Sequence, residues 1–336
     1  MPRRSPVSLA DIASHDTLAT AFWQAAKGKR HREEVRCFAA RLDQELSSLR
    51  DDILTQRAPE GRWTSFRIHD PKPRRILAPC FRDRVLHHAM MLWMGPILER
   101  GLIDDTFACR TGKGTLAAVH RAQHHLRRFP WFVKADVRAY FASVDHGLLR
   151  ALLQRRFKDP GLLALCERVL ERTPDKAARG LPIGALTSQW FANAYLDVLD
   201  RFLLERLGVR GMVRYMDDLV WWCDDRERAS DTLARATDFA AEERALELKQ
   251  SAQIGRSALG LPFLGFRVFA GKLRLSLRRR RRYRTARTKW EGAFARGEVG
   301  AMELQAGYSA ALAITAHAGA SAFRAADLGR RSPVDA

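Results

Sequence analysis

The amino-acid sequence predicts an α+β protein in which helices cover a small antiparallel sheet. From Trp131 onward the side chains alternate between two faces, which is the pattern of a strand with a buried side. Residues 213–222 contain two β-prone segments separated only by Asp217 and Asp218, which predicts a hairpin with acids at its tip. Several other segments of the 336-residue chain carry apolar residues at helical spacing.

The first hundred residues are predicted to contain helices on both sides of a pair of strands. Up to about Arg50 the pattern is helical, with one apolar stripe formed by Leu42, Leu46 and Leu49. Residues 62–79 are typical of short strands joined by a proline-rich turn at 70–73. Residues 82–98 return to helical spacing.

A long helix is predicted before the acidic hairpin and another after it. Thr187 or Ser188 can cap the first of these helices, and Gly208 closes it. The second helix covers residues 229–246. Residues 263–268 then form a further strand ahead of a basic C-terminal segment.

The balance of charge points to a polyanionic partner. The chain has 58 Lys and Arg against 38 Asp and Glu, a net charge of +20. Half of this excess lies between Lys272 and Lys289, in a segment without acids that includes Arg278, Arg279, Arg280, Arg281 and Arg282. Consecutive arginines repel one another unless an anion lies between them, so we expect this segment to bind a phosphate backbone. The alternative is a solvated helix face.

No segment has the length and composition of a membrane span. The longest apolar stretch, residues 89–98, is interrupted by Gly95 and Pro96 and falls short of the roughly 18 residues that a span needs. The basic N-terminus is followed by Asp11 and Asp16, where a signal peptide would carry an apolar region. We therefore expect a cytoplasmic protein without a membrane partner.

The cysteines support neither a zinc site nor a disulfide framework. There are five, they are scattered, and no two form a CxxC pair. We expect all of them to be buried thiols: Cys37, Cys80, Cys109, Cys166 and Cys223.

Three carboxylates lie where isolated charges are disfavoured. Asp136 ends a largely apolar strand, and Asp217 and Asp218 lie between two segments rich in large apolar residues. Adjacent like charges in apolar surroundings are costly unless a cation compensates them. Oxygen ligands suit Mg²⁺, with Mn²⁺ as an alternative, and two such ions clamp the reacting oxygens of a phosphoryl transfer. The pattern favours a two-metal nucleotidyl transferase over an ordinary turn and strand end.

These acids lie in motifs that resemble the reverse transcriptase family. Tyr215-Met216-Asp217-Asp218 is similar to the YxDD box of that family. Residues 134–141 (KADVRAYF) are similar to its first acidic motif, in which a paired aromatic follows the aspartate. Residues 180–189 (GLPIGALTSQ) resemble the loop and helix start that position the template and the incoming base. All three motifs stand in the order that the family has.

Further segments extend the resemblance over approximately residues 60–270. Residues 71–74 and 82–84 are similar to motifs of the fingers, residues 107–114 to a finger segment of bacterial members, and residues 261–266 to the primer-contacting segment. The resemblance implies an RNA-directed DNA polymerase with a right-hand architecture, which uses a template RNA, a primer and dNTPs.

The same resemblance implies a division of the chain into four parts. Residues 1–55 are then an N-terminal helical extension, residues 56–130 the fingers, residues 131–270 the palm with a finger-side insertion at 150–180, and residues 271–336 a short basic helical thumb.

Within the family, residues 183–189 look most like the enzymes of diversity-generating retroelements. Ala185 departs from the Asn or Ser that is more usual there. That resemblance implies error-prone copying at template adenines and a small basic accessory protein as partner. Bacterial enzymes of phage defence and other group II-like reverse transcriptases share much of the same core and remain alternatives.

The family resemblance also implies the roles of the acids. Asp136 and Asp217 would bridge two Mg²⁺ ions, Asp218 would complete the shell, and the backbone carbonyl of Val137 would reach one ion. One ion lowers the pKa of the primer 3′-hydroxyl, and the other holds the triphosphate.

Nucleotide-binding roles are implied for seven further residues: Lys72, Arg74, Tyr140, Phe141, Gly184, Gln189 and Lys249. The two basic finger residues would neutralise the triphosphate, and one aromatic of the pair, with Phe141 preferred, would pack on the sugar and exclude a 2′-hydroxyl. Gly184 would admit the template base pair, because a Cβ would intrude. Gln189 would touch the template strand, and Lys249 would protonate pyrophosphate.

Two other functions compete with this interpretation. An RNA-templated RNA polymerase would use the same chemistry, although the paired aromatic argues against it. A non-catalytic RNA-binding protein would keep the fold without the reaction, but it would have no reason to retain three carboxylates that repel one another.

Overall fold

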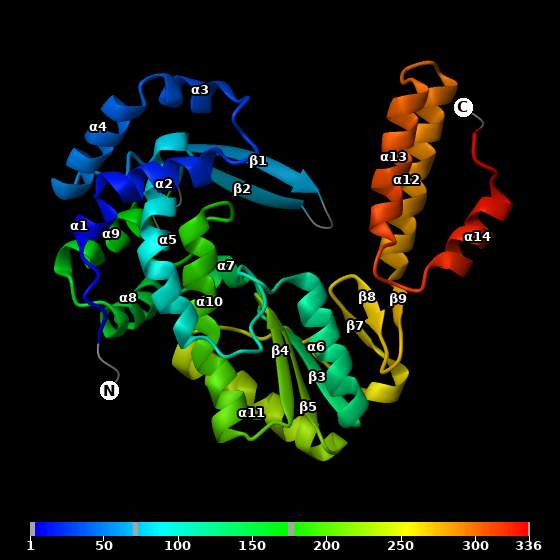
Figure 1. Ribbon diagram of the computed structural model, residues 1–336. Coiled ribbons are helices and arrows are strands. Elements are labelled where there is room, and N and C mark those ends of the chain that lie inside the picture. Colours follow the sequence, from blue (N-terminus) through cyan, green and yellow to red (C-terminus); the bar gives the residue numbers. More distant parts are fainter. Residues whose placement is uncertain (1–3, 70–72, 174–177, 335–336) are drawn as a thin grey trace.

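The computed structural model describes residues 4–69, 73–173 and 178–334, and its elements are shown in Figure 1. A helical N-terminal region with a projecting hairpin lies on one side of a central sheet, and a smaller sheet followed by helices lies on the other. The predicted α+β class with small antiparallel sheets is therefore confirmed. None of the described helices combines the length and apolar character that crossing a bilayer requires.

The central sheet has four antiparallel strands, in the spatial order β4 (Gly211–Tyr215), β5 (Asp218–Cys223), β3 (Trp131–Asp136) and β6 (Gln253–Arg256). The register of the inner pair places Asp136 opposite Asp218 and Val133 opposite Trp221. The predicted hairpin is thus the pair β4 and β5, and the strand predicted from residue 131 lies beside it.

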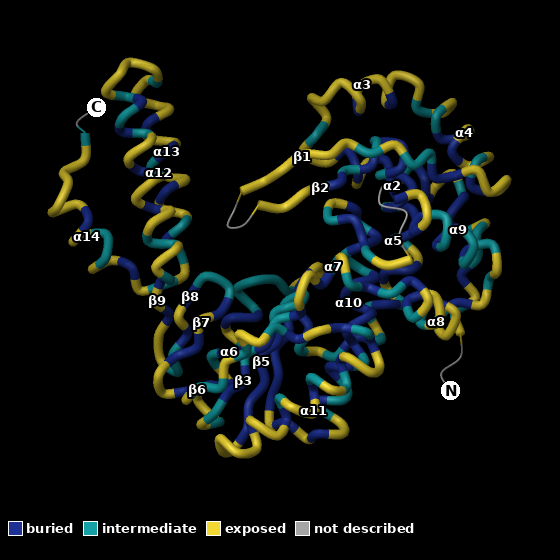
Figure 2. The backbone as a smooth tube through the Cα atoms, turned by 180° about the vertical axis from the view of Figure 1, so that it is seen from behind, coloured by how far each residue is buried: buried dark blue, intermediate teal, exposed yellow. Residues whose placement is uncertain are grey.

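Three helices cover the two faces of this sheet: α6 (Thr115–Arg128), α10 (Leu186–Arg201) and α11 (Arg226–Arg244). One face, with Val133 and Trp221, joins the core that includes α10 and α11. The opposite face, with Phe132 and Trp222, joins a second core with α6. Alternation along each strand therefore separates two hydrophobic cores, both of which are buried in Figure 2.

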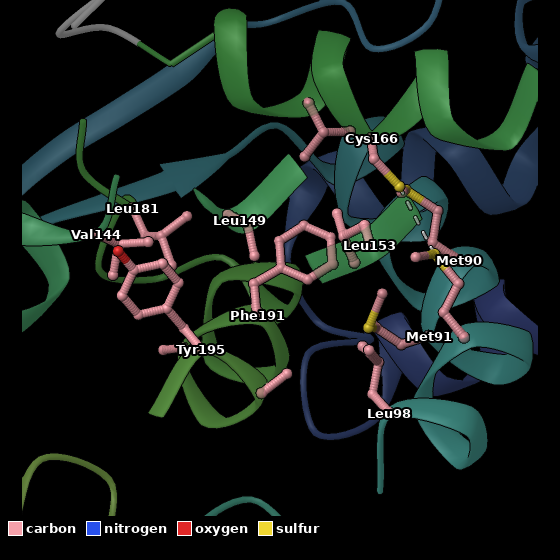
Figure 3. Packing of buried hydrophobic residues seen from close by; sticks show 14 of the residues in the cluster. Met90, Met91, Leu98, Val144, Leu149, Leu153, Cys166, Leu181, Phe191 and Tyr195 are labelled. Carbon is pink, nitrogen blue, oxygen red and sulfur yellow. Dashed lines mark hydrogen bonds between the residues drawn. The ribbon is translucent and has the colours of Figure 1, made fainter. Parts of the chain in front are cut away.

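The N-terminal region is built from helices: α1 (Leu9–Ile12), α2 (His15–Ala26), α3 (Glu33–Ala40), α4 (Leu42–Leu54), α5 (Phe81–Gly101), α8 (His146–Arg156) and α9 (Pro160–Glu171). In Figure 3, Phe191 of α10 packs near Leu149 and Leu153 of α8, with Met90 of α5 in the same cluster. The helical pattern predicted up to Arg50 is divided among four helices, and Gly28, with a φ of 71°, lies at one break.

Two short β structures flank the central sheet. β1 (Trp63–His69) and β2 (Pro73–Pro79) pair antiparallel, as predicted, and residues 70–72 of their turn lie outside the described residues. The second sheet contains β7 (Leu261–Phe263), β8 (Phe266–Val268) and β9 (Leu273–Leu275). The single strand predicted for residues 263–268 is wrong, because Leu264 and Gly265 adopt φ values of 45° and 84° and turn the chain.

The C-terminal residues form three helices: α12 (Leu277–Ala295), α13 (Ala301–Ile314) and α14 (Ser321–Arg330). Short elements complete the chain: α7 (Tyr140–Ser143), the π-helix η1 (Phe202–Arg206) and the 3₁₀-helix η2 (Ser257–Leu259). Figure 1 shows α12 and α13 standing opposite the projecting β1–β2 hairpin, with the central sheet between them.

Two sequence predictions about local structure are wrong. The N-cap of α10 is Ala185 and makes no side-chain hydrogen bond, whereas Thr187 and Ser188 are buried inside the first turn. The cysteines are not all buried thiols: Cys37 and Cys109 are exposed, Cys80 is half-buried, and only Cys166 and Cys223 are buried, all five being free. The exposed pair shows that cysteine is tolerated on this surface.

The buried His87 of α5 makes stability depend on pH. It is 2 % exposed, and its Nδ1 has no hydrogen-bond partner among the described residues. Burial lowers the pKa of His87 from 6.5 to about 3. As the pH falls below 6.5 the unfolded chain takes up the proton first, so folding loses about 1.4 kcal/mol per pH unit down to about pH 3.

We therefore expect the wild type to lose about 2 kcal/mol more folding free energy than His87→Leu between pH 7 and pH 5. Urea unfolding at both pH values measures this difference. The same substitution at the exposed His31 is the control. Equal losses in the wild type and His87→Leu would contradict the argument.

Candidate active site

The three predicted carboxylates meet at one end of the central sheet. Asp136 is the last residue of β3 and lies opposite Asp218, the first residue of β5. Asp217 lies in the turn between β4 and β5, and Met216 before it has a left-handed φ of 58°. The structure therefore brings together residues that are 81 positions apart in the chain.

The charges of these carboxylates act on one another. Burial, together with the nearby charge of Asp136, raises the pKa of Asp217 to about 6. Burial also raises the pKa of Asp218, while the ammonium of Lys134 opposes that shift. The site is thus a concentration of negative charge that needs compensating cations.

Two lysines supply part of that compensation. Lys249 Nζ lies 2.5 Å from Asp136 Oδ2, and its backbone N–H donates to the carbonyl of Asp136. Lys134 Nζ lies 3.4 Å from Asp218 Oδ1. No three His, Cys, Asp or Glu side chains of the described residues form a ready-made group of metal ligands. The two lysines contact one oxygen each of Asp218 and Asp136.

The donor set nevertheless fits a hard divalent cation. Asp136 Oδ1 is buried and has no hydrogen-bond partner among the described residues, so one oxygen of the site lacks a donor. The side-chain atoms of the three acids that could bind a metal ion are all carboxylate oxygens, which Mg²⁺ and Mn²⁺ prefer. Val137 follows Asp136, is fully buried, and forms an isolated bridge with Leu248, so its backbone is fixed beside the site.

The two aromatics after Asp136 lie in different surroundings. Tyr140 is 2 % exposed, and its hydroxyl donates to the carbonyl of Ala192 in α10, so it belongs to the core. Phe141 is half-buried and lines a cavity of about 320 Å³ together with residues of β2 and of the loop before α10, including Arg75, Leu77, Arg179, Leu181 and Pro182. Of the pair, only Phe141 can touch a molecule in this cavity.

Arg75, which the sequence analysis missed, faces this cavity, and Arg74 does not line it. Alternate residues of β2 share a face, so Arg75 lies on the side of the buried Leu77, whereas Arg74 lies on the other side. The alternation up to Leu77 was the signal that could have identified Arg75. Arg179 adds a second cation to the lining. Lys72, the other predicted finger residue, lies outside the described residues.

Gly184 and Gln189 lie at the start of α10. Gly184 has a φ of 130°, and a Cβ there would lie 2.5 Å from the carbonyl oxygen of Leu77. The steric demand for glycine therefore comes from the close approach of the loop to β2, where Leu77 N–H donates to the Ile183 carbonyl. Gln189 is half-buried, and its Oε1 lies 3.3 Å from the Cys109 sulfur.

The five consecutive arginines of α12 divide into two groups. Arg279 lies 4.1 Å from the ring centre of Phe266, and Arg280 stacks on Phe323 at 5.4 Å. Both are half-buried, so part of the run packs on aromatic rings. The remaining three, Arg278, Arg281 and Arg282, are exposed on the helix.

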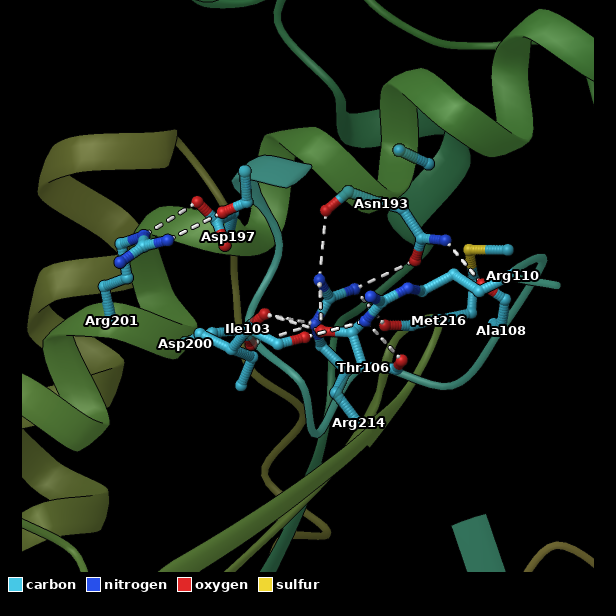
Figure 4. A network of polar contacts seen from close by, with 12 residues as sticks. Ile103, Thr106, Ala108, Arg110, Asn193, Asp197, Asp200, Arg201, Arg214 and Met216 are labelled. Carbon is cyan, nitrogen blue, oxygen red and sulfur yellow. Dashed lines mark hydrogen bonds and ion pairs between the residues drawn. The ribbon is translucent and has the colours of Figure 1, made fainter. Parts of the chain in front are cut away.

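A buried arginine holds the acidic turn between β4 and β5 in place (Figure 4). Arg214 of β4 is fully buried, and its Nε donates to both Asp200 carboxylate oxygens at 2.8 and 2.7 Å. Its Nη1 donates to the carbonyl of Met216 and to Asn193 Oδ1, both at 3.1 Å. Arg214 thereby links the turn that carries Asp217 to two residues of α10. In the sequence, the signal that could have predicted this network is the charged Arg214 within the otherwise apolar segment of β4.

Comparison with known proteins identifies the family. The model of the family described as reverse transcriptase (RNA-dependent DNA polymerase) matches residues 68–268, which is more than half of the chain. The matched region includes all three carboxylates. The chain belongs to the reverse transcriptase family.

Individual relatives are distant. The chain is 28 % identical to Protein YkfC of Escherichia coli (strain K12) over 214 residues, covering 58 % of this chain and 54 % of that one. It is 25 % identical to the group II intron-encoded protein LtrA of Lactococcus lactis subsp. cremoris over 166 residues, covering 48 % of this chain and 28 % of LtrA. The chain thus spans about half the length of the first relative and less than a third of the second.

A solved structure, apo telomerase from Candida tropicalis truncated from its C-terminal domain, is similar with a TM-score of 0.48 and 10 % identity. The similarity covers 65 % of this chain and 56 % of that chain.

The Arg214 network makes a prediction about stability. Lysine keeps the charge of Arg214 but lacks the planar fork, so Arg214→Lys cannot contact Asp200, Asn193 and Met216 together. We expect this variant to lose about 2–4 kcal/mol of unfolding free energy, measured by urea denaturation.

The matched control is Arg210→Lys, at the residue before β4. Its partner Asp224 is 55 % exposed and Arg210 itself 60 %, so solvent screens this pair and we expect no measurable change in unfolding free energy. Equal effects of the two substitutions would show that the buried network contributes nothing specific.

Proposed function

We propose that this chain is an RNA-directed DNA polymerase that extends a primer on an RNA template. The observation that carries the proposal is the pairing of Asp136 with Asp218 across β3 and β5, beside Asp217. A non-catalytic RNA-binding protein with the same fold would gain nothing from carboxylates that raise one another's pKa. A polymerase needs them, because they hold the cations of the reaction.

Asp136, Asp217, Asp218 and the Val137 carbonyl would hold two Mg²⁺ ions, with Mn²⁺ as an alternative, and these supply Lewis acidity to the reacting phosphoryl group. The carboxylates would hold the positive charge of the two ions at the end of the sheet. Lys249, which donates a hydrogen bond to Asp136, would move to the pyrophosphate and donate a proton to it.

The remaining residues of the site bind and select the nucleotide. Arg75 and Arg179 would neutralise the triphosphate in the cavity, and Lys72 and Arg74 of the same hairpin would add to this charge. Phe141 would pack on the deoxyribose and exclude a 2′-hydroxyl. Two further residues at the start of α10 would contact the base pair and the template, namely Gly184 and Gln189.

We propose the right-hand division of the chain on the same basis. Residues 1–55 are the N-terminal helical extension, 56–130 the fingers with the β1–β2 hairpin, 131–270 the palm with an insertion at 150–180, and 271–336 the basic thumb. The β1–β2 hairpin and α12, which stand opposite each other in Figure 1, would then lie on either side of the template and primer.

For the biological setting we propose a diversity-generating retroelement, with a template RNA and a small basic accessory protein as partners. The pattern of residues 183–189 supports this setting. The similarity to LtrA favours a second candidate, a group II-like reverse transcriptase. Sequencing of cDNA made in cells separates the two, because only the first setting concentrates changes opposite template adenines.

The central prediction concerns Asp217. We expect Asp217→Asn to lower primer extension on an RNA template by about 10³-fold or more, because a ligand is lost, while RNA affinity stays within about three-fold. Without metal, this variant should melt at a higher temperature than the wild type at pH 7.5, since one repelling charge is gone. Mg²⁺ should raise the melting temperature of the wild type more than that of the variant.

Asp224→Asn is the matched control, because Asp224 directly follows the opposite end of β5 and is exposed. It should extend primers like the wild type. Loss of RNA binding in Asp217→Asn would mean that this acid is structural. Incorporation of NTPs in preference to dNTPs by the wild type would instead indicate an RNA-templated RNA polymerase.

The arginine run of α12 yields a second prediction. Arg281→Gln with Arg282→Gln should reduce the salt slope of RNA binding by about 0.7–0.9 per lost phosphate contact. Arg279→Gln with Arg280→Gln should mainly lower stability, because these side chains pack on Phe266 and Phe323. Fluorescence anisotropy over a KCl series measures the slopes. An unchanged slope in the first variant would refute its role in phosphate binding.

A further inference from the structure

A basic cavity lies apart from the candidate active site, and we refer to it as the N-terminal basic cavity. Its volume is about 840 Å³, and it is formed where the start of the chain meets the ends of α5, α8 and α10. Six of its lining residues are cationic: Arg4, Arg100, Arg155, Arg156, Lys158 and Arg201. Neither the catalytic site nor the thumb uses any of them.

Hydrogen bonds and ion pairs fix the side chains at the floor of this cavity. Asp197, with a side chain 4 % exposed, accepts from Arg201 at 3.0 Å and lies 3.8 Å from Arg156. Arg201 also donates to the carbonyl of Gly101 at 2.7 Å. A Cβ on Gly101 would lie 1.7 Å from a terminal nitrogen of Arg156, so this guanidinium lies directly against the end of α5. One buried carboxylate thus positions two guanidinium groups.

The rim of the cavity carries charge without compensation. Arg4, Arg100, Arg155 and Lys158 are exposed, and within residues 4–69, 73–173 and 178–334 no ion pair involves them. Arg4 is held at the rim because the adjacent Ser5 donates its N–H to the carbonyl of Arg156 at 2.8 Å. Four cations from three separate segments therefore surround a floor that already carries two more.

The N-terminal basic cavity lies on a different side of the molecule from the thumb. In Figures 1 and 2, the chain start and α8 lie at one extremity, and α12 and α13 lie at the other. The central sheet and α10 separate them. A single short primer–template held between the β1–β2 hairpin and α12 would leave this cavity free.

We propose that the N-terminal basic cavity binds the phosphate backbone of an RNA segment that lies outside the primer–template. Phosphate oxygens match guanidinium groups in charge and in bidentate geometry. The exposed cations of the rim are spread over separate segments, which suits an extended polyanion. A site for a small anion would instead enclose it with buried polar groups. This second RNA site goes beyond the polymerase reaction and gives the chain a way to retain a structured template.

The test compares charge removal at the rim with charge removal elsewhere. The rim variant combines Arg100→Gln with Arg155→Gln, and the control combines Arg226→Gln with Arg235→Gln on the exposed side of α11. The probes are an RNA stem-loop without a primer terminus and, separately, a short primer–template duplex. We expect the rim variant to reduce the salt slope for stem-loop binding by about 1.4–1.8, with the control unchanged.

Primer extension by the rim variant on the short duplex should stay within about two-fold of the wild type, and Asp217→Asn should keep the full slope for the stem-loop. Failure of the polymerase proposal therefore leaves this test intact. A charge-conserving pair, Arg100→Lys with Arg155→Lys, should retain the slope, and circular dichroism confirms that each variant is folded.

Three results would overturn the proposal. One is an unchanged slope in the rim variant, and another is an equal loss in the α11 control. The third is binding of inorganic triphosphate to the wild type but not to the rim variant in equilibrium dialysis, together with unchanged stem-loop binding. That last result would assign the cavity to a small phosphorylated ligand.

Discussion

Repulsion among three carboxylates at one end of a four-stranded sheet is the constraint on which the rest of this molecule depends. Asp136, Asp217 and Asp218 are brought within electrostatic reach by the pairing of β3 with β5. Folding alone does not favour such an arrangement, because it removes like charges from water and places them together. The surrounding structure must therefore hold the strands in register against this repulsion and provide positive charge nearby.

Both requirements are met by residues other than the three acids themselves. Lys134 and Lys249 contact two of the acids, and the fully buried Arg214 fixes the turn between β4 and β5. Burial raises the pKa of Asp200, the partner of Arg214, to about 6, while the charge of Arg214 opposes this shift. The geometry of the acidic turn thus depends on the buried ion pair of Arg214 and Asp200, whose removal from water costs free energy.

Sequence patterns predicted the parts of the fold that depend on alternation and on local spacing. The strand ending at Asp136, the acidic hairpin and the helices that precede and follow this hairpin in the chain follow from period two and period 3.6, and the structure contains all of them; α6 was not predicted. The adjacency of Asp136 and Asp218 could be stated only as a requirement of the chemistry, because strand order is set by packing of α10 and α11 on one face of the sheet. Lys72 lies outside the described residues, so its predicted role stays a prediction.

The errors have equally physical causes. Arg75 was missed because the order of basic residues in a turn does not reveal which face they occupy; the register from Leu77 does. The turn at Leu264 and Gly265 was missed since a run of six apolar and basic residues resembles one strand as well as two. Cys37 and Cys109 are exposed, and nothing in their local sequence distinguishes them from the buried cysteines.

The alternation of β3 has a consequence for how this chain can vary. Phe132 belongs to the core that includes α6, and Val133 belongs to the core that includes α11. Asp136 is the last residue of the same strand and lies opposite Asp218. Replacing any one side chain disturbs one of these three surroundings. Adding or deleting one residue would exchange both cores at once and carry the aspartate out of line with its partner, so the length of this strand is more tightly fixed than its composition.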